Sequence, residues 1–144
     1  MAEVGLLEDN TRIAKLCATM LQYVGHRVTI YEHPRECLKA LLPQFGTRES
    51  GKPAVYQSAT SPSLPVDVLI LDLYLPDIDG VEVLRYLSSH PHTQSLPLIF
   101  CTAATQSEIA RALRVAPHAS FVEKPFKMQS LASAIAKALA ERMR

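Results

Sequence analysis

An almost purely aliphatic run at residues 66–71 most constrains what this sequence can fold into, and Asp72 follows it directly. Apolar side chains on both faces of a strand are typical of the interior of a parallel sheet, where helices cover each face. Other apolar runs lie at residues 4–7, 27–30, 96–101 and 120–123. We therefore expect five strands, with the run at 66–71 as a central one.

Apolar side chains at helical spacing fill the intervals between these runs. The first helix can be capped by Asn10 and is ended by Gly25, which suits a helix terminus. The five helices are expected to begin near Asn10, Pro34, Gly80, Gln106 and Lys127. Strands and helices that alternate in this way predict an α/β fold with a doubly wound parallel sheet.

Residues 43–65 break this pattern, because they mix Gly, Pro, Ser and Thr without any sustained apolar period. We expect an extended loop there that contributes little to the core. Shortening residues 47–63 should therefore leave the fold intact. A length of 144 residues otherwise predicts one domain, spanning residues 1–144.

Composition narrows the class of protein. The net charge is +1 and no basic run is visible, which argues against direct contact with nucleic acid. No apolar stretch approaches the roughly 20 residues that span a bilayer, and the amino terminus does not resemble a signal peptide. These features predict a cytoplasmic protein without a membrane partner. The widely spaced Cys17, Cys37 and Cys101 are expected to be buried, reduced thiols.

Polar side chains follow four of the five predicted strands. Glu8 and Asp9 follow the first, Asp72 the third, Thr102 the fourth and Lys124 the fifth. Because ligands of doubly wound sheets bind at the carboxyl ends of the strands, we expect these side chains to converge on one crevice. Three carboxylates in one place repel one another unless a hard divalent cation lies between them, and magnesium prefers such oxygen ligands. A lysine and a hydroxyl opposite the metal would suit phosphoryl transfer to a carboxylate.

Motifs along the whole chain also resemble the receiver domains of two-component response regulators. They are Glu8-Asp9, Asp67-Val-Leu-Ile-Leu-Asp72, Leu75-Pro76, Asp79-Gly80, Thr102-Ala103 and Lys124-Pro125-Phe126. The resemblance implies a flavodoxin-like fold of five βα units with strand order 2-1-3-4-5. It also implies that Asp72 is the phosphoacceptor, and that Glu8, Asp9, Asp72 and the carbonyl of Tyr74 hold Mg²⁺.

Further roles come from the same resemblance. Thr102 and Lys124 would contact the phosphoryl oxygens, and Phe121 would act with Thr102 as a switch whose rotamer responds to phosphorylation. The Lys124–Pro125 bond would be cis. The donor would be a sensor histidine kinase or a histidine phosphotransfer protein, and the phosphorylated domain would act on a downstream effector protein or a fused output domain. The domain would catalyse only its own phosphorylation and dephosphorylation.

Two other classes of function remain open from the sequence. A flavodoxin-like electron carrier has the same topology, but it needs a Ser, Thr or Gly-rich loop after the first strand, where Glu8 and Asp9 would repel an anionic phosphate. An interaction module that has lost phosphorylation would not need the complete acceptor set. A free-standing regulator is slightly favoured over the receiver portion of a longer chain.

Overall fold

Five parallel strands form one sheet in the part of the chain that the computed structural model describes, which is residues 2–42, 64–73, 75, 79–103, 105–124 and 127–142. They are β1 (Glu3–Leu7), β2 (Arg27–Tyr31), β3 (Val68–Leu71), β4 (Leu98–Thr102) and β5 (Ser120–Glu123). The order across the sheet is β2-β1-β3-β4-β5, and every neighbouring pair is parallel. The predicted doubly wound sheet and its strand order are confirmed.

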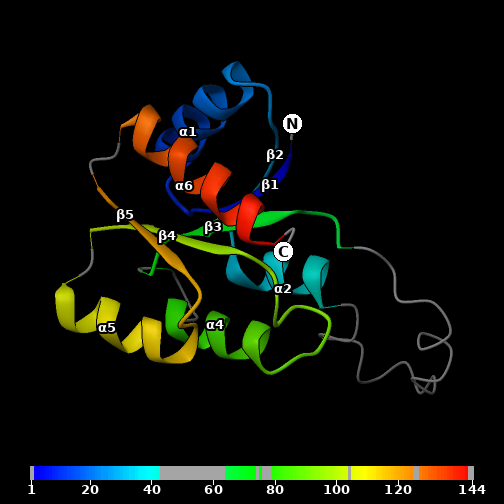
Figure 1. Ribbon diagram of the computed structural model, residues 1–144, viewed down its shortest axis with the longest axis vertical. Coiled ribbons are helices and arrows are strands. Elements are labelled where there is room, and N and C mark those ends of the chain that lie inside the picture. The colour runs from blue at the N-terminus through cyan, green and yellow to red at the C-terminus, as the bar shows by residue number, and fades with distance from the viewer. Residues whose placement is uncertain are drawn as a thin grey trace, which may run out of the picture.

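Helices cover both faces of this sheet. Figure 1 shows α1 (Thr11–Tyr23) and α6 (Met128–Arg142) on one face, and α2 (Pro34–Leu41), α4 (Gly80–Ser88) and α5 (Gln106–Val115) on the other. Two apolar clusters fill the spaces between the sheet and the two helical layers. The domain is therefore a three-layer α/β/α structure in which the central strands β3 and β4 are covered on both faces.

The central strand β3 contributes side chains to both apolar clusters. Val68 and Ile70 pack in the cluster beneath α1 and α6, whereas Leu69 and Leu71 pack in the cluster beneath α2, α4 and α5. All four side chains are fully buried. Successive side chains of a strand point to opposite faces, so an aliphatic run is what a strand covered on both sides requires. Each of these side chains contributes about 1.5–3 kcal/mol by leaving water.

The helices that follow β1, β3 and β4 begin with side-chain caps at the carboxyl edge of the sheet. The Asn10 side chain accepts hydrogen bonds from the backbone N–H groups of Arg12 and Ile13. Asp79 accepts from the N–H of Val81 in the same way. Thr105 opens α5 with a capping box. Such caps satisfy N–H groups that have no partner within the helix, and they fix the turns that carry the strand-end residues.

Some predictions fall on residues that the structure does not describe. The expected loop at residues 43–65 lies outside the described part except for Leu64 and Pro65, and Leu64 packs partly buried against the core. Tyr74 and the Lys124–Pro125 bond are also outside it. The three cysteines are buried free thiols, as predicted. Among the described helices, none is both long and apolar enough to span a membrane.

Candidate functional site

Asp72 lies directly after β3 and is buried, with about 7% of its surface exposed. Its backbone N–H donates to the carbonyl of Leu7 at 3.3 Å, which holds the residue against the end of β1. Thr102, the last residue of β4, donates its hydroxyl hydrogen to Oδ1 of Asp72 at 2.7 Å. The ends of three neighbouring strands therefore fix the position of this carboxylate.

Lys124 bridges the first and third strand ends. Its Nζ donates to Oε1 of Glu8 at 2.8 Å and to Oδ2 of Asp72 at 2.8 Å. Its backbone N–H donates to the carbonyl of Thr102 at 3.1 Å, so the lysine is anchored to β4 as well. The second oxygen of Glu8 accepts from the backbone N–H of Asn10 at 3.2 Å, at the start of α1. Four predicted site residues, Glu8, Asp72, Thr102 and Lys124, are thus brought into one hydrogen-bonded group.

The electrostatics of this group depend on burial and on the ion pairs. Burial raises the pKa of Glu8, and the hydrogen bond from Lys124 opposes that increase. Burial alone would lower the pKa of Lys124, but its hydrogen bonds to Asp72 and Glu8 leave that pKa raised overall. The ammonium therefore stays protonated at neutral pH. The side chains of Glu8, Asp72 and Lys124 are only 5%, 9% and 15% exposed, so water screens their attraction weakly.

The remaining acidic residue, Asp9, is placed differently. It is exposed beside the buried Glu8, and no group of three or more His, Cys, Asp or Glu side chains in the described ranges is gathered closely enough to hold a metal. The donor chemistry nevertheless fits a hard cation, because Glu8, Asp9 and Asp72 offer only carboxylate oxygens at one edge of the sheet. Lys124 already contacts two of these carboxylates, so a cation would share them with its ammonium group.

Phe121, the predicted switch residue, lies on β5 opposite Phe100 of β4. About 38% of its surface is exposed, which places the ring at the surface beside the open edge of the sheet. It belongs to neither buried apolar cluster, whereas the next residue, Val122, packs inward beneath α6. The Phe121 ring therefore lies at the surface and outside both buried clusters.

Sequence reasoning assigned no role to the residues that hold the turn after Asp72. A side chain at Gly80 would place its Cβ 2.6 Å from Cα and 2.8 Å from the carbonyl oxygen of Leu73, so only glycine fits. Gly80 also donates its N–H to that same carbonyl at 3.2 Å. Asp79 caps α4 and accepts a hydrogen bond from Arg111 of α5 at 3.3 Å. The Asp79-Gly80 pair was visible as a motif, but the close approach to Leu73 depends on the tertiary fold.

Comparison with known proteins identifies the class. A family model described as the response regulator receiver domain matches residues 4–136, and this chain belongs to that family. The response regulator SaeR of Staphylococcus epidermidis is 23% identical over 131 residues, which cover 91% of this chain and 47% of that protein. SaeR of Staphylococcus aureus is 24% identical over the same share of each chain. The chain therefore spans about half the length of these curated relatives.

Solved structures show the same fold. A putative response regulator from Chloroflexus aurantiacus superimposes with a TM-score of 0.74 at 23% identity, over 96% of this chain and 98% of that one. The receiver domain of a sensor histidine kinase from Pseudomonas aeruginosa gives a TM-score of 0.71 at 24% identity, over 96% and 98%. That second structure contains a magnesium ion coordinated in its active site cleft. The flavodoxin-like carrier is set aside by the family match.

Proposed function

We propose that this receiver domain takes up a phosphoryl group on Asp72 in a magnesium-dependent reaction. The observation that carries the proposal is the buried bridge from Lys124 to Asp72 and Glu8, with Thr102 bonded to the other oxygen of Asp72. An ammonium and a hydroxyl already in contact with the acceptor carboxylate are placed to meet phosphoryl oxygens without large rearrangement. Preorganised charge of this kind is the main contribution that a protein makes to phosphoryl transfer.

The transfer step follows from these contacts. A carboxylate oxygen of Asp72 attacks phosphorus, and an O–P bond forms while the bond from phosphorus to the donor's nitrogen or oxygen breaks. Lys124 and Thr102 exchange their hydrogen bonds to Asp72 for hydrogen bonds to the phosphoryl oxygens. Glu8 keeps Lys124 at the site during this exchange, because it retains one of the two ion pairs. The product is an acyl phosphate, which water can hydrolyse.

Magnesium would be held by Glu8, Asp9 and Asp72 together with the carbonyl of Tyr74. When bound, it would supply positive charge that neutralises the carboxylates and the incoming phosphoryl oxygens. Glu8 has both oxygens engaged, one by Lys124 and one by Asn10. The exposed Asp9 carries no such restraint, so it is the acid best placed to turn toward a metal.

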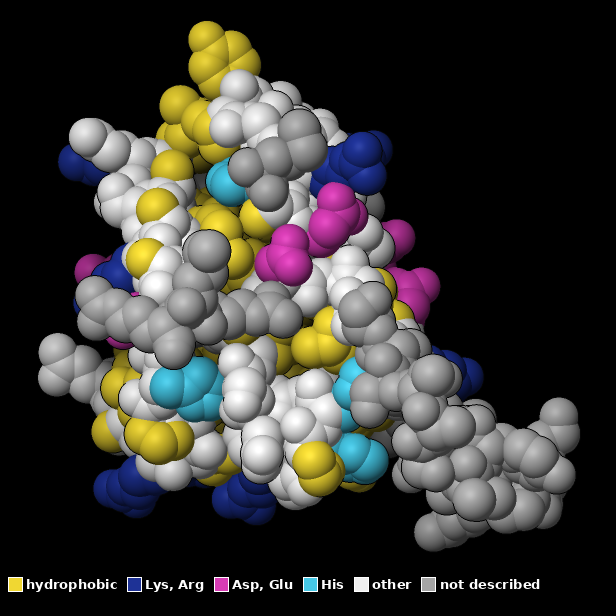
Figure 2. Space-filling model, turned by 45° about the vertical axis from the view of Figure 1, so that its right-hand side comes forward, with side chains coloured by type: hydrophobic (Ala, Val, Ile, Leu, Met, Phe, Trp, Pro, Cys, Tyr) yellow, Lys and Arg dark blue, Asp and Glu magenta, His cyan; other side chains and the backbone are white. Residues whose placement is uncertain are grey.

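The partners proposed for this domain follow from its class. A sensor histidine kinase or a histidine phosphotransfer protein would donate the phosphoryl group in the cytoplasm, and an effector protein or a fused output domain would respond. The face formed by α5, β5 and α6 would carry the signal, with Arg111, Arg114, His118 and Lys127 toward the partner. On the face shown in Figure 2, Lys and Arg side chains lie apart from one another and form no continuous basic patch.

Labelling with acetyl phosphate tests the proposal. Wild-type protein should gain an alkali-labile adduct, visible by intact-mass spectrometry, when magnesium is present and not in excess chelator. Asp72→Asn should abolish the adduct, because the amide is not a nucleophile. Asp67→Asn is the matched control: Asp67 lies at the other end of the same strand, where its Oδ2 accepts the N–H of Glu3 at 2.9 Å.

Asp9→Ala tests metal binding independently of the nucleophile Asp72. This variant should lose labelling at low magnesium and recover part of it at high magnesium, since one ligand is missing while Asp72 is intact. Labelling of Asp72→Asn at the wild-type level, or equal labelling of the wild type with and without chelator, would overturn the proposal.

A further inference from the structure

Two turns leave the acceptor site and lead to neighbouring helices on the same face of the sheet (Figure 1). The turn after Asp72 leads to Asp79, which caps α4, and the turn after Thr102 leads to Thr105, which caps α5. At the strand ends the two turns are joined by the hydrogen bond from Thr102 to Asp72, at 2.7 Å. Further out they are joined again, because Nη2 of Arg111 on α5 donates to Oδ2 of Asp79 at 3.3 Å. These contacts close a ring that includes the acceptor.

The first residue of α4 packs against the backbone of the acceptor itself. Gly80 donates its N–H to the carbonyl of Leu73 at 3.2 Å. A Cβ at this position would lie 3.0 Å from the carbonyl oxygen of Asp72, which shows how closely the two segments approach. Because an interior packed this closely transmits displacements, a shift of the helix start moves Asp72 as well. Asp79 directly precedes Gly80, so a contact that holds Asp79 also holds the acceptor.

The two carboxylate oxygens of Asp79 have different tasks. Oδ1 accepts the N–H of Val81 at 3.0 Å and so caps α4, whereas Oδ2 accepts the hydrogen bond from Arg111. The cap fixes the start of α4 within its own helix, and the ion pair fixes it relative to α5. Both side chains of the ion pair are about half-exposed, so water screens it and its energy is small. It can therefore adjust the position of the turn without deciding whether the protein folds.

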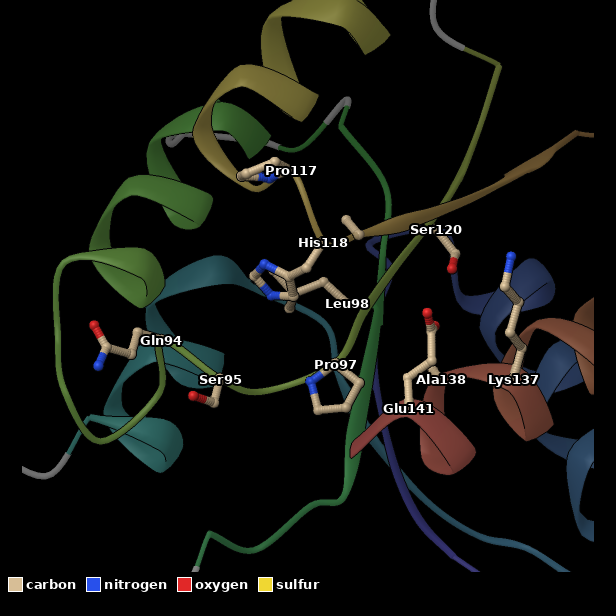
Figure 3. A pocket seen from close by; sticks show the side chains of 11 residues that line it. Gln94, Ser95, Pro97, Leu98, Pro117, His118, Ser120, Lys137, Ala138 and Glu141 are labelled. Atoms are coloured by element: carbon tan, nitrogen blue, oxygen red, sulfur yellow. The ribbon is translucent and has the colours of Figure 1, made fainter. Parts of the chain in front are cut away.

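The helix α5 is a firm support for this contact, because it is anchored independently of Arg111. Ala112 and Ala116 are fully buried in the cluster beneath α2, α4 and α5. Beyond the end of the helix, Nε2 of His118 lies 3.2 Å from the carbonyl oxygen of Leu96, and Figure 3 shows the His118 ring beside Leu98 of β4. Loss of the ion pair should therefore leave α5 in place and loosen only the start of α4.

We propose that Arg111 is a positioning residue for phosphoryl transfer, which acts through Asp79 on the turn that follows Asp72. The inference rests on the proposed function, because it requires Asp72 to be the acceptor. Arg111 does not touch the phosphoryl group; it limits the displacement of the acceptor carboxylate from the geometry in which its oxygen meets phosphorus. Its loss slows the chemical step without weakening the binding of the donor, since Lys124 and Thr102 are unchanged.

The test follows labelling of the full chain by intact-mass spectrometry over a series of acetyl phosphate concentrations at saturating magnesium. Arg111→Gln and Asp79→Asn should each lower the maximal rate about threefold, within what a half-exposed ion pair can contribute, and leave the half-saturating concentration unchanged. Asparagine also caps helices, so Asp79→Asn removes the charge and keeps the cap. The double variant should be no slower than either single variant, because only one contact is lost. Arg111→Lys keeps the charge and should recover most of the rate.

Arg85→Gln is the matched control. Arg85 pairs with Glu82 at 3.2 Å and is similarly exposed, but this ion pair lies within α4 and joins no second helix, so the variant should label like the wild type. Amide hydrogen exchange of the unphosphorylated proteins gives a second measurement: Gly80 should exchange about threefold faster in Arg111→Gln than in Arg85→Gln, because its bond to Leu73 opens more often. Folding of every variant is checked by near-UV circular dichroism.

Three results would overturn the inference alone. They are equal labelling of the wild type and Arg111→Gln, unchanged exchange at Gly80, or rate changes of opposite sign in Arg111→Gln and Asp79→Asn. These two variants change the net charge in opposite directions, so opposite effects would mean that long-range charge acts on the anionic donor. A wild type that takes up no label would reject the proposed function and this inference together.

Discussion

The two ends of the strands use similar polar side chains in different ways. At the amino end, Asp67 accepts the backbone N–H of Glu3 at 2.9 Å, and Nδ1 of His26 accepts the N–H of Ala2 at 3.1 Å. At the carboxyl end, the side chains of Asp72 and Lys124 bond to each other and to their neighbours' side chains. Asp67 and His26 at the amino end therefore bond to backbone N–H groups. Asp72, Thr102 and Lys124 at the carboxyl end bond to one another through their side chains, so an incoming ligand can take over these hydrogen bonds without loosening a strand.

Replacing one positively charged side chain at each end of the strands should give the largest difference in the free energy of unfolding. Lys124→Met leaves Glu8 and Asp72 buried without their counter-charge, and we expect a loss of about 3 kcal/mol in the free energy of unfolding. Arg27→Met breaks an ion pair with Glu3 that is 3.6 Å long and largely exposed, which should cost less than about 0.5 kcal/mol.

Urea denaturation at neutral pH measures the loss of stability in Lys124→Met and in Arg27→Met. Added magnesium should restore part of the stability of Lys124→Met, because it supplies the missing positive charge between the carboxylates. Equal losses for the two variants would show that burial at the carboxyl end carries no special electrostatic cost.

Substitutions of two glycines, one at each end of the strands, extend the comparison to the backbone. Gly80→Ala forces a Cβ against the backbone of Leu73 next to Asp72, and we expect a loss of about 2–3 kcal/mol together with slower labelling. Gly25, before β2, has open space around it but a φ of +100°. Gly25→Ala should therefore cost only about 1 kcal/mol, from backbone strain alone. Thermal unfolding and acetyl phosphate labelling of both variants check this; unchanged labelling in Gly80→Ala would separate the turn from the acceptor.

Much of the fold and of the site was predictable because the signals are local. The aliphatic run of β3 requires cover on both faces, and the residue after each strand of a parallel sheet falls at one edge, which identified Asp72, Thr102 and Lys124. The first and last residues of the strands were predicted less accurately. The fourth strand was expected from residue 96, but β4 begins at Leu98, because Pro97 has no N–H to donate to a ladder.

Side-chain pairing could not be predicted, because it links residues far apart in the sequence. Glu8 and Asp9 are adjacent and chemically alike, yet Glu8 is buried on Lys124, 116 positions away, and Asp9 is exposed. Which of two neighbouring acids turns inward depends on the direction of its Cβ at the end of β1, and only the folded backbone sets that direction. The open edge of β5 likewise follows from strand order.

The smallest expected effect comes from His26 at the amino end. Its Nδ1 accepts a hydrogen bond from Ala2, so the unprotonated ring is the form that the fold binds. Burial lowers the pKa of His26 below its usual value near 6.5. Since the unfolded chain takes up this proton more readily, the contribution is fully present above about pH 6.5 and is lost as the pH falls through the folded pKa.

We expect less than about 1 kcal/mol from this group, the usual value of one such hydrogen bond. His26→Gln offers an acceptor that does not titrate, so its free energy of unfolding should fall less steeply than that of the wild type between about pH 7 and pH 5. Urea titrations across that range measure the two slopes. Parallel slopes would mean that His26 is protonated equally in the folded and unfolded chain, and that its contact with Ala2 does not depend on the neutral ring.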